Sequence, residues 1–135
     1  MLYTHGGKSR KFEWGFANDL LTIKNEFERI HVYPLREIYS ILQWLESEFH
    51  NEWFPLANNV EKLGNGTERK GLGIAIYRQN PGDVTHAQGA SYLGVVLESV
   101  RLFEWNGAKW GIQWRITRPI NNIDDVSSAL KNNAA

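Results

Sequence analysis

The stretch from Thr85 to Thr117, THAQGASYLGVVLESVRLFEWNGAKWGIQWRIT, decides the fold that we expect. It begins with a polar run in which Thr85 is suited to cap a helix. Apolar residues then recur at helical spacing and form one stripe, whose members are Ala90, Leu93, Val96, Leu97 and Val100. The residues expected to face elsewhere are Gln88, Ser91, Tyr92, Val95 and Glu98. The pattern therefore predicts a helix over 85–101.

The second half of this stretch contains two aromatic runs that flank Asn106-Gly107. Both of these residues tolerate positive φ, so the pair favours a two-residue type I′ turn between antiparallel strands. Alternation along the second strand separates an apolar face from a polar face. The apolar face holds Trp110, Ile112, Trp114 and Ile116, and the polar face holds Gln113, Arg115 and Thr117. A hairpin over 102–117 therefore follows the helix directly.

A second helix is predicted from Pro34 to Trp53, where Pro34 suits the first helical position and Pro55 prevents continuation. Its apolar stripe consists of Leu35, Ile38, Leu42, Leu45 and Phe49. Residues 56–63 suit a short helix that ends at Gly64, and residues 64–71 read as a glycine-rich loop. Residues 72–77 fit either a strand or a helix, and residues 80–83 predict a turn.

The N-terminal part favours a β-hairpin. Apolar and polar residues alternate from Phe12 to Phe16, Asn18-Asp19 supplies a turn, and residues 20–24 return. Residues 27–33 fit a third strand, although a short helix could equally start at Asn25. We therefore expect a small α+β domain with about three helices and antiparallel hairpins over 12–118. A flexible basic arm over 1–11 precedes it, and a mobile tail with at most one short helix follows over 119–135.

Composition narrows the functional classes. The chain has 135 residues, no cysteine and a formal net charge of zero. Disulfides and thiol chemistry are excluded, and neither a membrane span nor a signal peptide is evident. We expect a cytoplasmic protein. Charge is unevenly distributed, because residues 12–61 are acidic whereas residues 1–11 and 62–118 are basic. Such asymmetry is typical of a surface that faces a polyanion, and equally of ordinary surface scatter.

No catalytic motif accompanies these features. The four histidines, His5, His31, His50 and His86, lack the spacing of metal ligands, and no serine has the context of a nucleophile. His50-Asn51-Glu52 has the shape of part of a zinc-deaminase motif, but the cysteine pair that this chemistry requires is missing. We therefore predict a non-enzymatic protein without metal or cofactor.

The order of helix and hairpin resembles the C-terminal half of winged helix-turn-helix domains over residues 34–117. The resemblance implies that the last helix enters the major groove of duplex DNA and that the hairpin, as a wing, contacts the backbone. The residues assigned to base edges or phosphates are Thr85, His86, Gln88, Ser91 and Tyr92. The residues that the resemblance assigns to phosphate contacts are Arg101, Lys109, Arg115 and Arg118.

Two other functions fit the same sequence. The tryptophan-rich hairpin, with Trp105, Trp110 and Trp114, could be the seam of a homodimer or of another protein–protein contact. A pocket lined by tryptophans and His86 could instead bind a small ligand. Stacking of single-stranded bases beside Arg115 and Arg118 is a further use of these aromatic residues.

Overall fold

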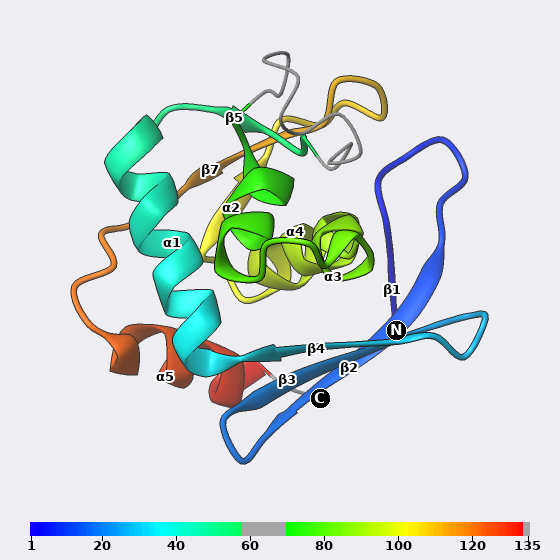
Figure 1. Ribbon diagram of the computed structural model, residues 1–135. Helices are drawn as coiled ribbons and strands as arrows, with labels where there is room; N and C mark the ends of the chain where they lie inside the picture. The colour runs from blue at the N-terminus through cyan, green and yellow to red at the C-terminus, as the bar shows by residue number, and fades with distance from the viewer. Residues whose placement is uncertain (58–69, 134–135) are drawn as a thin grey trace.

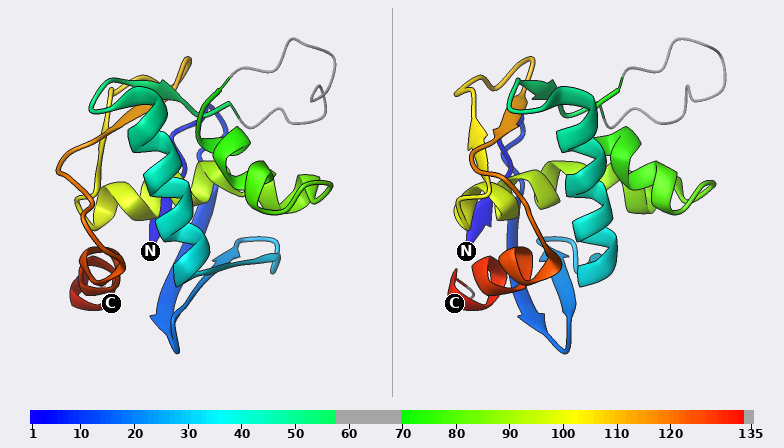
Figure 2. Two further views of the ribbon diagram at one scale, coloured as in Figure 1. Left: turned by 60° about the vertical axis from the view of Figure 1, so that its left-hand side comes forward. Right: turned by 90° about the vertical axis from the view of Figure 1, so that its left-hand side faces the viewer.

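The computed structural model describes residues 1–57 and 70–133. They form an α+β fold with two antiparallel sheets and, within these residues, five helices rather than about three. Figures 1 and 2 show helices α3 (Val84–Gln88) and α4 (Ala90–Ser99) at the centre, between the two sheets. The described part contains no helix with the length and apolar content needed to cross a membrane.

The first sheet has the strand order β1-β2-β3-β4. Its strands are β1 (Leu2–Tyr3), β2 (Lys11–Ala17), β3 (Leu20–Asn25) and β4 (Ile30–Pro34). The predicted hairpin is confirmed, because Ala17 pairs with Leu20 and the two intervening residues, Asn18 and Asp19, have φ of 54° and 59°. Positive φ at both positions is the signature of a type I′ turn. The alternative left open for residues 27–33 is settled in favour of a strand, which begins only at Ile30 because the chain turns before it, with Glu28 at φ of 64°.

Helix α1 (Leu35–Phe49) carries the predicted stripe, with Leu35, Ile38, Leu42 and Leu45 buried. It is shorter than the expected helix over 34–53 at both ends. Pro34 belongs to β4, where it pairs with Leu20, and so it precedes the first helical residue. At the other end the N–H of His50 still donates to the carbonyl of Glu46. The helix ends there because His50 adopts a positive φ of 57°.

A short strand, β5 (Phe54–Pro55), leads from α1 toward the second sheet. The helix expected over 56–63 and the loop over 64–71 lie almost wholly outside the described residues. Helix α2 (Leu72–Gln79) settles the alternative left open for residues 72–77. The turn predicted over 80–83 is confirmed by a hydrogen bond from the Asp83 N–H to the Asn80 carbonyl.

The single helix predicted over 85–101 is wrong, because the chain breaks at Gly89 into α3 and α4. Gly89 lies against the Tyr33 hydroxyl, and an added Cβ would be 3.0 Å from His31 Nδ1. The predicted cap is also wrong. Asp83 caps α3, since its Oδ1 accepts the backbone N–H of His86 at 3.0 Å. The apolar stripe of α4 is buried as expected, and Val95, expected to face elsewhere, is buried as well.

The second sheet has the order β5-β7-β6, with β6 (Phe103–Trp105) and β7 (Gln113–Ile116). The two-residue turn predicted at Asn106-Gly107 is wrong, because Trp105 pairs with Trp114 and a loop spans 106–112. Within this loop Asn106 Oδ1 accepts the Ala108 N–H at 3.0 Å, and Trp105 Nε1 donates to the Ala108 carbonyl at 3.1 Å. These bonds give the loop its own internal order.

Both ends of the chain pack on the domain, where we expected a mobile arm and tail. Strand β1 pairs with β2, and the buried Thr4 accepts the Arg10 N–H at 2.8 Å. Helix α5 (Ile123–Asn133) lies beside α1 and β2, and buries Val126 and Leu130 (Figure 1). The two ends therefore contribute to the same core as the central elements.

Candidate binding cleft beside the second sheet

The predicted site residues fall into two separate places. Five lie on α3 and α4, Arg101 lies in the turn after α4, and three belong to the β6–β7 hairpin and its continuation. On the helices, Thr85 and Gln88 are exposed and Ser91 is half-buried. His86 and Tyr92 are committed to contacts inside the protein, as described next. The structure therefore does not bring the predicted residues together into one surface.

His86 joins α3 to α1. Its Nε2 lies 2.8 Å from Oε2 and 3.1 Å from Oε1 of Glu37, and the two side chains are only 14% and 9% exposed. Asn80 Nδ2 also donates to Glu37. The Tyr33 hydroxyl donates to the His86 carbonyl at 2.8 Å, and burial raises the pKa of that hydroxyl. His86 thus holds helices together rather than facing a partner.

Tyr92 faces the first sheet. Its hydroxyl accepts a hydrogen bond from Asn25 Nδ2 at 3.3 Å, and its ring meets Phe12 edge to face at 5.2 Å. The His31 ring lies 5.6 Å away. Burial lowers the pKa of His31, and the neighbouring His86 and Arg29 lower it further. This side of α4 is therefore an internal contact with the sheet.

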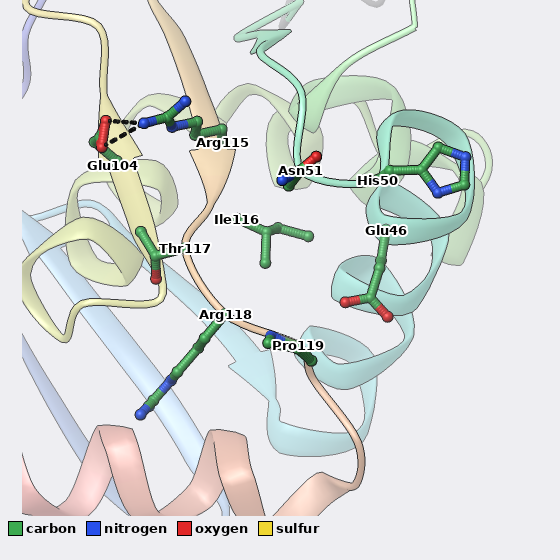
Figure 3. A pocket seen from close by; sticks show the side chains of 9 residues that line it. All are labelled: Glu46, His50, Asn51, Glu104, Arg115, Ile116, Thr117, Arg118 and Pro119. Carbon is green, nitrogen blue, oxygen red and sulfur yellow. Dashed lines mark hydrogen bonds and ion pairs between the residues drawn. The ribbon is translucent and has the colours of Figure 1, made fainter.

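Arg115 and Arg118, in contrast, line one cleft of about 700 Å³ (Figure 3). Strand alternation buries Trp114 and Ile116 against the core and turns Arg115 and Thr117 outward, as predicted. The opposite wall comes from the end of α1 and the turn after it. The other residues that line the cleft are Glu46, His50, Asn51, Glu104 and Pro119.

Arg115 is held by its neighbours on the outward face of the sheet. Its Nη2 donates to both carboxylate oxygens of Glu104, at 2.9 and 3.1 Å, across the β6–β7 pair. Its guanidinium lies 4.7 Å from the centre of the Trp53 ring, which is a cation–π distance. About 42% of its side chain is exposed. The guanidinium is therefore oriented but still accessible from the cleft.

The two carboxylates of the cleft already have partners, whereas Arg118 has no ion-pair partner among the described residues. Glu104 binds Arg115, and Glu46 Oε2 accepts the Ile120 N–H at 3.3 Å. Arg118 is exposed and, among the described residues, makes no ion pair. In Figure 3 its side chain extends toward α5. A cation without a counter-ion at the rim of the cleft is free to meet an anion.

Lys109 lies apart from the cleft, in the loop between β6 and β7. Next to it Trp110 is 82% exposed. The indole lies against Gly7, where an added Cβ would be 2.7 Å from Trp110 Cη2. Lys8 follows directly. The exposed indole thus has two exposed lysines nearby along the chain, Lys109 next to Trp110 and Lys8 next to Gly7.

Sequence reasoning missed Glu46 as a cleft residue, and it named Trp53 only as one of several tryptophans that could line a pocket or stack bases beside Arg115 and Arg118. His50 and Asn51 were considered only as part of a metal motif. Within residues 1–57 and 70–133, no group of three or more histidine, aspartate or glutamate side chains could hold a metal ion. Comparison of the chain with protein-family models, curated proteins and solved structures finds no match.

Proposed function

We propose that this is a non-enzymatic nucleic-acid-binding protein that contacts its ligand with the β6–β7 hairpin and the cleft beside it. The observation that carries the proposal is that the cleft presents two accessible arginine side chains. Arg118 has no carboxylate partner in the described part of the chain, and Arg115 is oriented by Glu104 and Trp53. Arginine forks match phosphate geometry, so both residues suit phosphodiester contacts. A cytoplasmic location is part of the proposal.

The hairpin loop supports the same function in a different way. An exposed indole flanked by cations can stack on a nucleobase while the lysines neutralise nearby phosphates. Trp110, Lys109 and Lys8 have this arrangement. Stacking requires an unpaired base, so the loop favours single-stranded nucleic acid. Duplex DNA, which the winged-helix resemblance implies, remains the second probe to compare.

The groove-reading role of 85–101 receives less support. Most of α4 is buried, and His86 and Tyr92 are bound to Glu37 and Asn25. Thr85 and Gln88 are the exposed members of the predicted set on these helices. We therefore propose that the hairpin carries the binding, and that any contact from α3 is secondary.

Binding of labelled single-stranded and duplex oligonucleotides by fluorescence anisotropy tests the proposal. The wild-type protein should bind at low ionic strength, and Lys109→Ala with Arg115→Ala should weaken binding. The matched control is Arg29→Ala with Arg36→Ala, since both arginines are exposed and neither lines the cleft. Absence of binding by the wild type at about 50 mM salt contradicts the proposal, because phosphate contacts are strongest there.

Self-association is a second candidate. The tryptophan seam is a weak basis for it, because Trp114 is buried and Trp105 is stacked on His5 at 3.6 Å. The edge of the first sheet formed by β4 is a better candidate for the interface between two copies. Ile30 and Val32 on this edge strand are 60% and 39% exposed. Hydrogen bonds from Asn25 to Arg29 and from Leu35 to Asp19 imply that Ile30 and Val32 turn their backbone groups away from β3.

A second copy of β4 fits that edge. We propose antiparallel pairing about Val32, which would join two sheets. Sedimentation at high concentration should then give a dimer that Val32→Lys converts to a monomer. A monomeric wild type would exclude this candidate, and it would leave nucleic-acid binding to be judged by its own experiment.

A further inference from the structure

Arg101 occupies a backbone position that favours glycine. It follows α4, where the Leu102 N–H donates to the Leu97 carbonyl at 2.9 Å and the Arg101 N–H donates to that of Glu98 at 3.0 Å. These two bonds define a Schellman motif, in which the residue at Arg101 adopts the left-handed conformation. Its φ is 66°. A side chain at this position strains the backbone, and outliers of this kind often accompany a function.

Arg101 also lies near a second arginine. The Thr117 hydroxyl donates to the Arg101 carbonyl at 2.7 Å, and the Thr117 N–H donates to the Leu102 carbonyl at 3.1 Å. These bonds hold the turn after α4 against the end of β7, so Arg101 and Arg118 lie at the same end of the β6–β7 pair. Nearby like charges repel each other. Neither arginine forms an ion pair with any described carboxylate.

The two arginines border a hollow of about 390 Å³ above α5. Its other polar lining residues are Asn121, Asp125, Ser128 and Asn132. The single carboxylate among them, Asp125, accepts the backbone N–H groups of Asn121 and Asn122 through Oδ2 at 3.0 and 3.2 Å. Hydrogen-bond donors thus surround the hollow, and the carboxylate is engaged at the start of α5.

We propose that Arg101 and Arg118 bind a phosphate group in this hollow. A bound anion would screen the repulsion between the arginines, and two guanidinium forks can share one phosphate. The inference rests on the proposed function, since a nucleic-acid backbone would supply the phosphate. Arg118 and Pro119 line both the hollow and the cleft of Arg115, so one strand could reach both.

Arg101→Gly is the most informative variant, because glycine relieves the backbone strain while it removes the cation. Calorimetric titration with inorganic pyrophosphate should show at least a tenfold loss of affinity. The thermal midpoint should stay constant or rise. Arg118→Gln, which leaves the backbone unchanged, should also lose affinity. Arg36→Gln, on the exposed side of α1, is the matched control and should bind as the wild type does.

The inference is wrong if the wild-type protein does not bind pyrophosphate, or if both variants bind it with unchanged affinity. It is also wrong if Arg101→Gly lowers the thermal midpoint while Arg118→Gln keeps its affinity for pyrophosphate. The proposed function is judged separately with the oligonucleotides. Pyrophosphate binding without oligonucleotide binding would refute the function and keep the phosphate site. Oligonucleotide binding that is weakened by Lys109→Ala with Arg115→Ala but unchanged by Arg101→Gly would keep the function and refute the phosphate site.

Discussion

The indole ring of Trp114 lies directly against Gly94. A Cβ added at Gly94 would be 2.5 Å from Cζ2 and 2.7 Å from Cζ3 of that ring. One helical turn further along α4, Glu98 Oε1 accepts the Trp114 Nε1 proton at 3.1 Å. His5 Nε2 lies 2.6 Å from the same oxygen. The central helix, the second sheet and the N-terminal segment therefore meet at this tryptophan.

Gly94→Ala should destabilise the protein. Alanine is a better helix former by about 1 kcal/mol, but overpacking against the buried ring costs about 1–3 kcal/mol. Because three atoms of the buried ring would lie within 2.7 Å of the added Cβ, the cost should exceed the gain, and urea unfolding should give a net loss of about 1–2 kcal/mol. Gly15→Ala is the control, because nothing lies within 4 Å of an added Cβ there. A Gly94→Ala protein as stable as the wild type would show that the ring does not contact α4 this closely.

Glu37→Ala should loosen the contact between α1 and α3. The substitution removes the acceptors of His86 and Asn80 from a site where Glu37 is 9% exposed. Leaving such groups unpaired costs about 1–3 kcal/mol, measurable by urea unfolding. Glu52→Ala, at an exposed carboxylate just after α1, should change stability by less than about 0.5 kcal/mol. Equal effects of the two substitutions would contradict the assigned role of Glu37.

The free energy of unfolding should decrease as the pH is lowered, because His31 takes up a proton. Burial lowers the pKa of this histidine below its ordinary 6.5, with His86 and Arg29 acting in the same direction and Asp83 opposing. The unfolded chain therefore binds the proton more tightly, and acidification favours unfolding. The contribution is intact above about pH 6.5 and is lost as the pH falls toward the lower folded pKa.

His31→Gln should flatten this part of the profile. The measurement is the difference in urea midpoint between wild type and variant at about pH 7.5 and about pH 5, since the histidine titrates between them. Titrating groups far from His31 contribute equally to both proteins and cancel, so the difference reports His31 together with its neighbours His86 and Asp83. An identical pH dependence of the urea midpoint in the two proteins would show that His31 does not contribute to the loss of stability in acid.

Leu130→Ala tests whether the C-terminal residues belong to the core. Leu130 is 0% exposed in α5, and truncation of such a side chain costs about 2–5 kcal/mol. Lys131→Ala, on the exposed side of the same helix, should change stability by less than about 0.5 kcal/mol. If residues 119–135 were a mobile tail in solution, neither substitution would affect the urea midpoint.

Local patterns predicted the elements in which side-chain alternation or periodicity agrees with burial. The hairpin from Phe12 to Lys24 and the stripe of α1 are of this kind. Gly89 could be recognised in the sequence as a weak point of the helix, but the close approach of Tyr33 and His31 from β4, which leaves no room for a side chain there, is visible only in the folded chain. Tertiary contacts of this type override a continuous apolar pattern.

The prediction of a two-residue turn at Asn106-Gly107 was wrong for a similar reason. An Asn-Gly pair permits a tight turn, but the register of β6 and β7 depends on what the strands pack against. Pairing of Trp105 with Trp114 brings Trp114 to Gly94, and Asn106 instead organises the longer loop through Ala108 and Gly111. The two-residue turn formed at Asn18-Asp19, where strand pairing is continuous on both sides.

For the candidate site, strand alternation was enough to place Arg115 on a polar face, and the winged-helix resemblance assigned Arg115 and Arg118 to phosphate contacts. The rest of the cleft was not accessible to such reasoning, because Glu46, His50 and Asn51 come from the distant end of α1. Trp53 was one of several tryptophans expected near Arg115 and Arg118, and only the folded chain shows that its ring is the one in contact with Arg115. Arg101 had been assigned to phosphate, but its positive φ and its position near Arg118 follow only from the folded chain.

The salt dependence of single-stranded DNA binding tests the central claim most directly. The affinity of the wild-type protein should fall linearly with salt on logarithmic axes, since each neutralised phosphate adds about 0.7 to the slope. Arg115→Ala with Arg118→Gln should reduce that slope by about 1.4, as two phosphate contacts are lost. Binding that is absent at low salt, or a slope that the double substitution leaves unchanged, would contradict the account.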